Sequence, residues 1–174
     1  TKITAIVRRQ KTVEALGEQL LPDLVDYIGA VQGALYVLND DAYEPLLEPV
    51  TLFAYNRYKS ADRSFRVGEG LVGQAAIEQE MIYRTEIPEE YVTVTSGLIE
   101  DSKPSSLLIM PLISEERLQG VIEFASLADF ERKKRRFIEE LSEIIARTIY
   151  NLKVNTRTER LLRESQQMTQ ELQQ

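Results

Sequence analysis

The long segment between Pro88 and Pro104 carries the side chains most suited to binding a ligand. It holds a phenol and three small hydroxyl groups close together in the sequence. Hydroxyl groups donate and accept hydrogen bonds, so they can close over a cavity that holds a small polar molecule. Loops of this length are uncommon unless they are functional or structured internally, and a solvated loop with a short strand at YVTVT is the equal alternative. The four side chains are Tyr91, Thr93, Thr95 and Ser96.

Glu123 is a further residue whose position suggests a role in ligand binding. It lies between Ile122 and Phe124 in a run of apolar residues, where a charge is costly unless it is paired. It either faces a pocket or, as is more common for a charge within a strand, pairs with an Arg or Lys or lies at a solvated edge.

The glycines at 68, 70 and 73 form the spacing GxGxxG, which in dinucleotide-binding proteins places a pyrophosphate at a helix N-terminus. The context does not fit that role. The preceding residues ADRSFRV are short and polar, whereas the fingerprint needs a buried parallel strand, and Glu69 would place a carboxylate beside the phosphates. We therefore predict a turn at Gly68 followed by a closely packed helix over 71–79.

The composition excludes several kinds of chemistry. The 174 residues include no Cys and no His, so a disulfide framework, a thiolate nucleophile, a zinc thiolate site and the commonest general base are all missing. We predict no metal site, and an enzyme would have to work with carboxylates, Lys, Tyr or Ser. The formal charge of −7 argues against nonspecific nucleic-acid binding. No apolar run approaches the ~20 residues of a membrane-spanning helix.

The elements that position these residues centre on the stretch 105–127. Its two halves, 107–113 and 118–125, are apolar runs separated by a short charged turn. Apolar residues on both alternating faces indicate strands that are covered on both sides, so we expect this hairpin in the middle of a sheet.

The N-terminal residues have a helical pattern. Apolar residues recur at three- and four-residue steps over 2–28. Pro22 should kink or restart this helix, so that 20–29 forms a second piece ending at Gly29. Strands are predicted at 33–38 and 50–55, which should form a hairpin, and shorter ones at 65–67 and 81–84.

The C-terminal residues predict one long helix that Asp129 caps and that continues through Gln174. About 46 residues at 1.5 Å each give ~70 Å, roughly twice the diameter of the domain, so the end of the helix must protrude. Apolar and small residues recur there with alternating steps of four and three, which predicts a weak coiled coil and a parallel dimer. These residues are Val154, Thr158, Leu161, Ser165, Met168 and Leu172.

The order and spacing of four segments resemble the GAF domain, a small sensory module of signalling proteins. The segments are GALYVL, GEGLVGQAA, PSSLLIMPLISEERLQGVIEFAS and FIEELSEIIARTI, which together cover about 17–150. The resemblance implies an α+β, GAF/PAS-like fold: a six-stranded antiparallel sheet with N- and C-terminal helices packed on one face and a pocket-side layer of loop and helix on the other.

The segment EIPEEYVTVTSGL and the tail NTRTERLLRESQQMTQEL are similar in sequence to GAF modules of large bacterial sensor proteins. In such proteins, including the histidine kinases of two-component systems, the modules precede kinase, phosphatase or cyclase domains. We expect an N-terminal signalling helix at 1–16, a GAF domain at 17–150 and a coiled-coil linker at 151–174. The chain begins at Thr1 and ends in QELQQ without a helix stop signal, so we expect it to be a piece of a longer polypeptide.

The resemblance also bears on ligands. The NKFDE signature of cyclic-nucleotide-binding members is not visible, and the Cys and His that hold bilin and haem in other members are absent. No haem or bilin cofactor is therefore expected, and a small polar or amphipathic molecule is the implied ligand. The side chains expected to touch it are Tyr91, Thr93, Thr95, Ser96, Ser106 and Glu123.

Three functions are compatible with these features. The first is a cytoplasmic regulatory sensor that forms a homodimer through its terminal helices and passes a signal to an output domain in the same parent chain. It would contact neither nucleic acid nor membrane directly, whether or not the parent protein is membrane-tethered. The second is a ligandless structural linker that only dimerises. The third, an enzyme, is remote, because the methionine-sulfoxide reductase branch of the GAF fold uses cysteines, and this chain has none.

Overall fold

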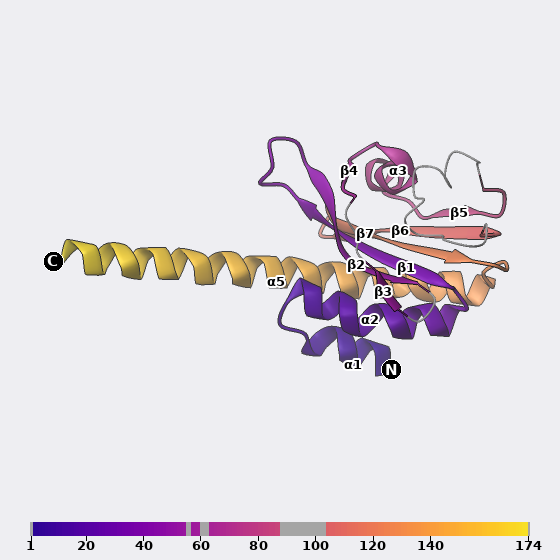
Figure 1. Cartoon of the computed structure of the whole chain (residues 1–174), viewed down its shortest axis with the longest axis horizontal. Helices are drawn as coiled ribbons and strands as arrows, with labels where there is room; N and C mark the ends of the chain where they lie inside the picture. The colour runs from indigo at the N-terminus through magenta and orange to yellow at the C-terminus, as the bar shows by residue number, and fades with distance from the viewer. Residues whose placement is uncertain (1, 55–56, 60–62, 88–103, 174) are drawn as a thin grey trace.

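The computed structural model describes residues 2–54, 57–59, 63–87 and 104–173. The terminal helices cover one face of a single sheet, and the short helix α3 (Gly70–Glu78) lies on the other face (Figure 1). Helix α5 (Arg132–Leu172) runs along the sheet and continues far beyond it, so the C-terminus lies well away from the domain.

The sheet is antiparallel throughout, in the order β3-β2-β1-β7-β6-β5, and the two-residue strand β4 pairs separately with β2. The predicted six-stranded antiparallel sheet is therefore confirmed, with β4 as a short addition. The hairpin formed by β6 and β7 lies in the interior of the sheet, also as predicted. The strands are β1 (Gln32–Asn39), β2 (Leu46–Ala54), β3 (Arg57–Lys59), β4 (Phe65–Arg66), β5 (Ile82–Arg84), β6 (Ser106–Ser114) and β7 (Arg117–Ser126).

The N-terminal helical segment breaks at a different place from the one predicted. Helix α1 (Lys2–Arg9) is separated from α2 (Val13–Ile28) by a turn in which Thr12 Oγ1 accepts a hydrogen bond from the Ala15 N–H at 3.0 Å. This bond satisfies one of the free amides at the start of α2 and fixes where that helix begins. The predicted restart at Pro22, with a second helical piece over 20–29, is wrong. Helix α2 continues through the proline, because the leucines on either side of it are fully buried in the core.

The face of the sheet toward α2 and α5 holds the main hydrophobic core. Phe124 and Leu108 point into it from the sheet, and Ile145 meets them from α5. Burying a side chain of this size stabilises the fold by about 1.5–3 kcal/mol. The predicted packing of both terminal helices on one face is confirmed.

The glycine-rich stretch forms the turn into α3. Gly68 and Gly70 have φ angles of +93° and +64°, which glycine adopts without strain. A Cβ on Gly73 would lie 2.5 Å from the backbone oxygen of Arg66, so only glycine fits there. Since β4 has two residues and pairs antiparallel with β2, the dinucleotide fingerprint is excluded, and the predicted turn and closely packed helix are confirmed.

Helix α5 begins later than predicted. It starts at Arg132, after Glu131, whose side chain makes no capping hydrogen bond, so the expected cap at Asp129 is wrong. Its 41 residues span about 60 Å at 1.5 Å per residue. Every described residue from Val154 onward is exposed, so the end of the helix protrudes as predicted. In the part of the chain that the structure describes, no helix combines the length and the apolar character needed to cross a membrane.

Candidate ligand-binding site

Strand β1 presents Gln32, Ala34 and Tyr36 to the face that α3 covers, because alternate residues of a strand point to the same side. The register of β1 and β7 places Ala34 directly opposite Glu123 and Gln32 opposite Ala125. Residues directly opposite in an antiparallel pair share a face. Glu123 therefore lies on this face, diagonal to both Gln32 and Tyr36. We call Gln32, Tyr36 and Glu123 the polar triplet.

Gln32 is buried, and its side-chain oxygen lacks the hydrogen bond that burial normally requires. Its side chain is 2% exposed, and its Oε1 atom has no hydrogen-bond partner among the described residues. Leaving a buried acceptor unsatisfied costs about 1–3 kcal/mol. A polar side chain kept at such a cost is a candidate for binding a ligand that donates a hydrogen bond to it.

Tyr36 and Glu123 interact electrostatically within the triplet. Burial raises the pKa of Tyr36 well above its usual value, the nearby Glu123 carboxylate raises it further, and the Arg63 guanidinium lowers it. The phenol is therefore neutral at physiological pH and keeps its proton to donate. Glu123 is 3% exposed on an interior strand, so the alternative that placed it at a solvated edge is wrong.

Alanines surround the polar triplet. Ala34 lies between Gln32 and Tyr36 along β1, while Ala54 and Ala125 lie opposite Gln32 on the two neighbouring strands. All three alanines are buried. A side chain of one methyl group lets a bound molecule approach the sheet more closely than a leucine or valine would. We call Ala34, Ala54 and Ala125 the alanine floor.

Charged groups lie beside the triplet at the start of α3. The Arg63 guanidinium lies 4.8 Å from the centre of the Phe65 ring and 3.7 Å from the Glu69 carboxylate. Glu69 also accepts a hydrogen bond from the Arg66 N–H at 2.9 Å, which ties the first turn of α3 to β4. The Phe65 ring packs edge-on against Tyr36 with ring centres 5.5 Å apart. The buried triplet thus has an exposed cation and an aromatic ring at its side.

Two of the predicted site residues, Ser106 and Glu123, belong to the described part of the chain, and they lie on opposite faces of the sheet. Ser106 pairs with Ser126, and its Oγ donates a hydrogen bond to the Ala128 oxygen at 2.6 Å on the helix-covered side. Ser126 Oγ donates to the Gly29 oxygen at 3.0 Å on that same side. Glu123 faces α3, so the two are not brought together. The other four candidates, Tyr91, Thr93, Thr95 and Ser96, lie outside the described residues.

The sequence analysis missed Gln32 and Tyr36. Both belong to QGALYVL, where they alternate with residues that face the helix core. Two hydrogen-bonding side chains four positions apart, and therefore on the same face of a central strand, are the signal that could have found them. Among the described residues, no group of three or more acidic side chains is placed to hold a metal ion.

Comparison with known proteins gives the family. A family model described as GAF domain matches residues 10–149, more than half of the chain. No protein of curated function matches.

Solved structures share the fold at low identity. The GAF domain of a phosphoenolpyruvate-protein phosphotransferase from Coxiella burnetii has a TM-score of 0.71 and 16% identity, with 90% of this chain and 93% of that chain covered. A methyl-accepting chemotaxis protein, residues 122 to 287, has a TM-score of 0.68 and 12% identity, with 87% and 97% covered. Free methionine-R-sulfoxide reductase from Neisseria meningitidis, in complex with its substrate, has a TM-score of 0.67 and 19% identity, with 88% and 87% covered.

The fold and the site define the class: an α+β domain built on one antiparallel sheet, with terminal helices on one face and buried polar groups under a short helix on the other. Within that class, the chain belongs to the GAF domain family.

Proposed function

We propose that this GAF domain is a regulatory sensor module that binds a small polar molecule on the face covered by α3. The observation that carries this proposal is the polar triplet. Three hydrogen-bonding side chains are buried there on the face away from the main core, and one of them has an unsatisfied acceptor. Stability alone would favour apolar residues at such positions. The ligand would donate hydrogen bonds to Gln32 and Glu123 and could accept one from Tyr36.

A solved structure with the same fold supports the binding of a small molecule. The Neisseria meningitidis reductase is described in complex with its substrate, so the fold can hold a small molecule. That enzyme's activity does not extend to this chain in our proposal, because the chemistry uses cysteines and the chain has none. Turnover of methionine sulfoxide by the purified chain would contradict this part of the proposal.

The protruding part of α5 supports a parallel homodimer. Val154, Leu161 and Met168 belong to the predicted heptad seam and are 41%, 55% and 64% exposed in the single chain. Pairing two copies along this seam would bury these side chains and give a coiled coil that carries a signal to an output domain in the same polypeptide. This dimer is proposed to act in the cytoplasm without contacting nucleic acid or membrane.

Native mass spectrometry of the freshly purified chain tests the proposal. We expect a dimer whose mass exceeds twice the denatured chain mass by that of a bound small molecule. A bare dimer would instead support the second candidate function, a dimerising linker, which the exposed seam favours independently of any ligand. A bare monomer would contradict both functions.

A further inference from the structure

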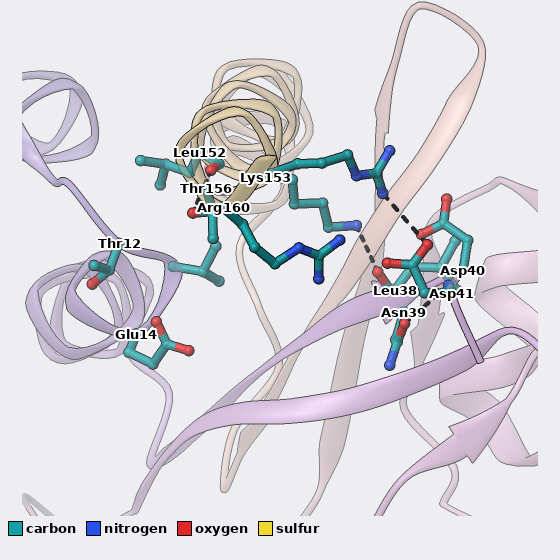
Figure 2. Close-up of a pocket in the computed structure, with 12 residues that line it drawn as sticks. Thr12, Glu14, Leu38, Asn39, Asp40, Asp41, Leu152, Lys153, Thr156 and Arg160 are labelled. Atoms are coloured by element: carbon teal, nitrogen blue, oxygen red, sulfur yellow. Dashed lines mark hydrogen bonds and ion pairs between the residues drawn. The ribbon is translucent and has the colours of Figure 1, made fainter. Parts of the chain in front are cut away.

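The place where α5 leaves the domain is held by contacts with the β1–β2 turn. A groove of about 550 Å³ lies between this turn, α5 and the start of α2 (Figure 2). Across it, Lys153 Nζ donates a hydrogen bond of 2.6 Å to the backbone oxygen of Leu38, which is 115 positions away in the sequence. Figure 2 shows the Lys153 side chain reaching from α5 to this carbonyl.

A second contact lies one helical turn further along α5. The Arg157 guanidinium lies 3.6 Å from the Asp41 carboxylate. The turn that carries Asp41 is held by its own hydrogen bond, because the Asn39 side-chain oxygen accepts from the Asp41 N–H at 3.0 Å. Leu152 is the last residue of α5 that is buried. Among the described residues, the Lys153 and Arg157 contacts are therefore the last ones between α5 and the rest of the domain before the helix continues into solvent.

The Lys153 contact depends on the position of the carbonyl it binds. Burial lowers the pKa of Lys153, and Arg157 also lowers it, while Asp40 and Asp41 raise it. An ammonium group that is half removed from water is stable only while an acceptor replaces the lost water. If the Leu38 oxygen moved away, the ammonium group would lose the acceptor that replaces water, so the contact is sensitive to the position of the end of β1.

The same carbonyl lies close to the polar triplet along β1. Leu38 is two residues beyond Tyr36, so their side chains lie on the same face of the strand. Between Leu35 and Tyr36 the pairing of β1 with β2 shifts register. The extra residue, Val50, belongs to β2, so the ladder of hydrogen bonds is interrupted directly beside Tyr36. Beyond it, Leu38 pairs with Leu47, so Tyr36 and the carbonyl that Lys153 binds belong to one short paired segment that begins at the interruption.

We propose that the hydrogen bond between Lys153 and the Leu38 oxygen couples occupancy of the α3-covered face to the position of the protruding helix. This inference rests on the proposed sensor function, since it assigns the route of the signal. A ligand beside Tyr36 shifts the end of β1, Lys153 keeps or loses its acceptor, and α5 changes its direction where it leaves the domain.

The length of the protruding segment makes a small change measurable. From Lys153 to Gln170 the helix spans about 26 Å at 1.5 Å per residue. A tilt of about 10° at the exit would therefore move residue 170 by roughly 4–5 Å. The chain has no cysteine, so two introduced cysteines carry the only spin labels.

The test measures one distance in the chain of 174 residues. Labels at Glu80→Cys, just after α3, and Gln170→Cys, near the end of α5, report the tilt by pulsed electron paramagnetic resonance, with labelled chains diluted in unlabelled ones. Ala34→Val adds bulk on the alanine floor beside Tyr36 and stands in for a ligand. Ala30→Val adds the same volume beside the helix-covered core, outside the polar triplet and the alanine floor, and is the matched control.

We expect Ala34→Val to shift the distance by several ångströms, Ala30→Val to leave it unchanged, and Lys153→Met to abolish the Ala34→Val shift. An unshifted distance in Ala34→Val, or a shift that persists with Lys153→Met, would overturn the coupling. Circular dichroism confirms that each variant is folded. Native mass spectrometry distinguishes the proposed sensor function from the proposed coupling through Lys153. A chain that holds a bound molecule but shows no distance shift would refute only the coupling. A chain that shows the shift but holds no molecule would refute only the proposed ligand binding.

Discussion

Replacing Gln32 by leucine should stabilise the ligand-free domain and weaken its ligand. The side chain is 2% exposed and its Oε1 atom has no hydrogen-bond partner among the described residues. Leucine has a similar volume and no polar atom, so Gln32→Leu removes a desolvation cost of about 1–3 kcal/mol. For a chain of this size, each kcal/mol raises the melting temperature by about 2–4 °C. The gain would identify Gln32 as a residue kept for binding at the expense of stability.

Thr51→Val is the matched control for this experiment. Thr51 is 5% exposed, and its Oγ1 atom also has no hydrogen-bond partner among the described residues. It lies on the helix-covered face, where a Cβ on Gly17 would meet its hydroxyl. Valine at position 51 should stabilise the domain because it removes a buried oxygen that has no hydrogen-bond partner. It should leave ligand binding unchanged, because residue 51 lies on the face of the sheet opposite the one that α3 covers.

Urea denaturation measures the free energy of unfolding, and native mass spectrometry measures the fraction of chains that retain a bound molecule. We expect both variants to gain stability. Only Gln32→Leu should lose bound molecule, and the loss of one hydrogen bond of about 0.5–1.5 kcal/mol corresponds to roughly 2–10-fold weaker binding. A Gln32→Leu variant that is destabilised by more than about 1 kcal/mol would refute the reasoning, because the amide would then be a structural hydrogen-bonding group.

Three further predictions test other parts of the molecule. First, the pKa of Lys153 lies below its ordinary value of 10.5, so the unfolded chain holds this proton at pH values where the folded chain has lost it. The stability of the wild type relative to Lys153→Met should therefore rise as pH increases toward about 10.5 in urea titrations, and a falling difference would contradict the burial argument. Second, a Cβ on Gly120 would lie 2.2 Å from the backbone oxygen of Tyr36 on the neighbouring strand. Gly120→Ala should cost about 1–3 kcal/mol or more in unfolding free energy, and an unchanged urea midpoint would show that the β1–β7 register is wrong. Third, ending the chain after Asn155 removes residues that are exposed throughout the described range 156–173. The melting temperature at low concentration should be unchanged while sedimentation shows a monomer, and a truncated chain that still dimerises would place the interface elsewhere.

The sequence predicted those parts of the fold that depend on periodicity. The β6–β7 hairpin, the terminal helices and α3 all have a clear pattern of apolar residues and turn signals, and each is present. The break near Pro22 was predicted in the wrong place, because the local cost of a proline in a helix is smaller than the tertiary packing of the leucines beside it. The N-cap of α2 at Thr12 has a local sequence signal, but a weaker one than a proline.

The candidate site was less predictable because it depends on strand register. Ser106 and Glu123 lie on adjacent strands of one hairpin, and only the pairing of Ser106 with Ser126 shows that Ser106 points to the helix-covered side. Gln32 becomes notable only once its burial and its missing hydrogen bond are known. Neither property follows from residue type or spacing alone.

Nuclear magnetic resonance spectra of the alanine methyl groups test directly whether a small molecule is bound on the face covered by α3. The chain is labelled at its alanine methyls and recorded as freshly purified, then again after unfolding, dialysis and refolding to remove any bound molecule. We expect the methyl signals of Ala34, Ala54 and Ala125 to change position between the two spectra, while the signal of Ala146, which is buried on the helix-covered face, stays unchanged. Identical spectra for the alanine floor, or an equal change at Ala146, would contradict a ligand bound on the face covered by α3.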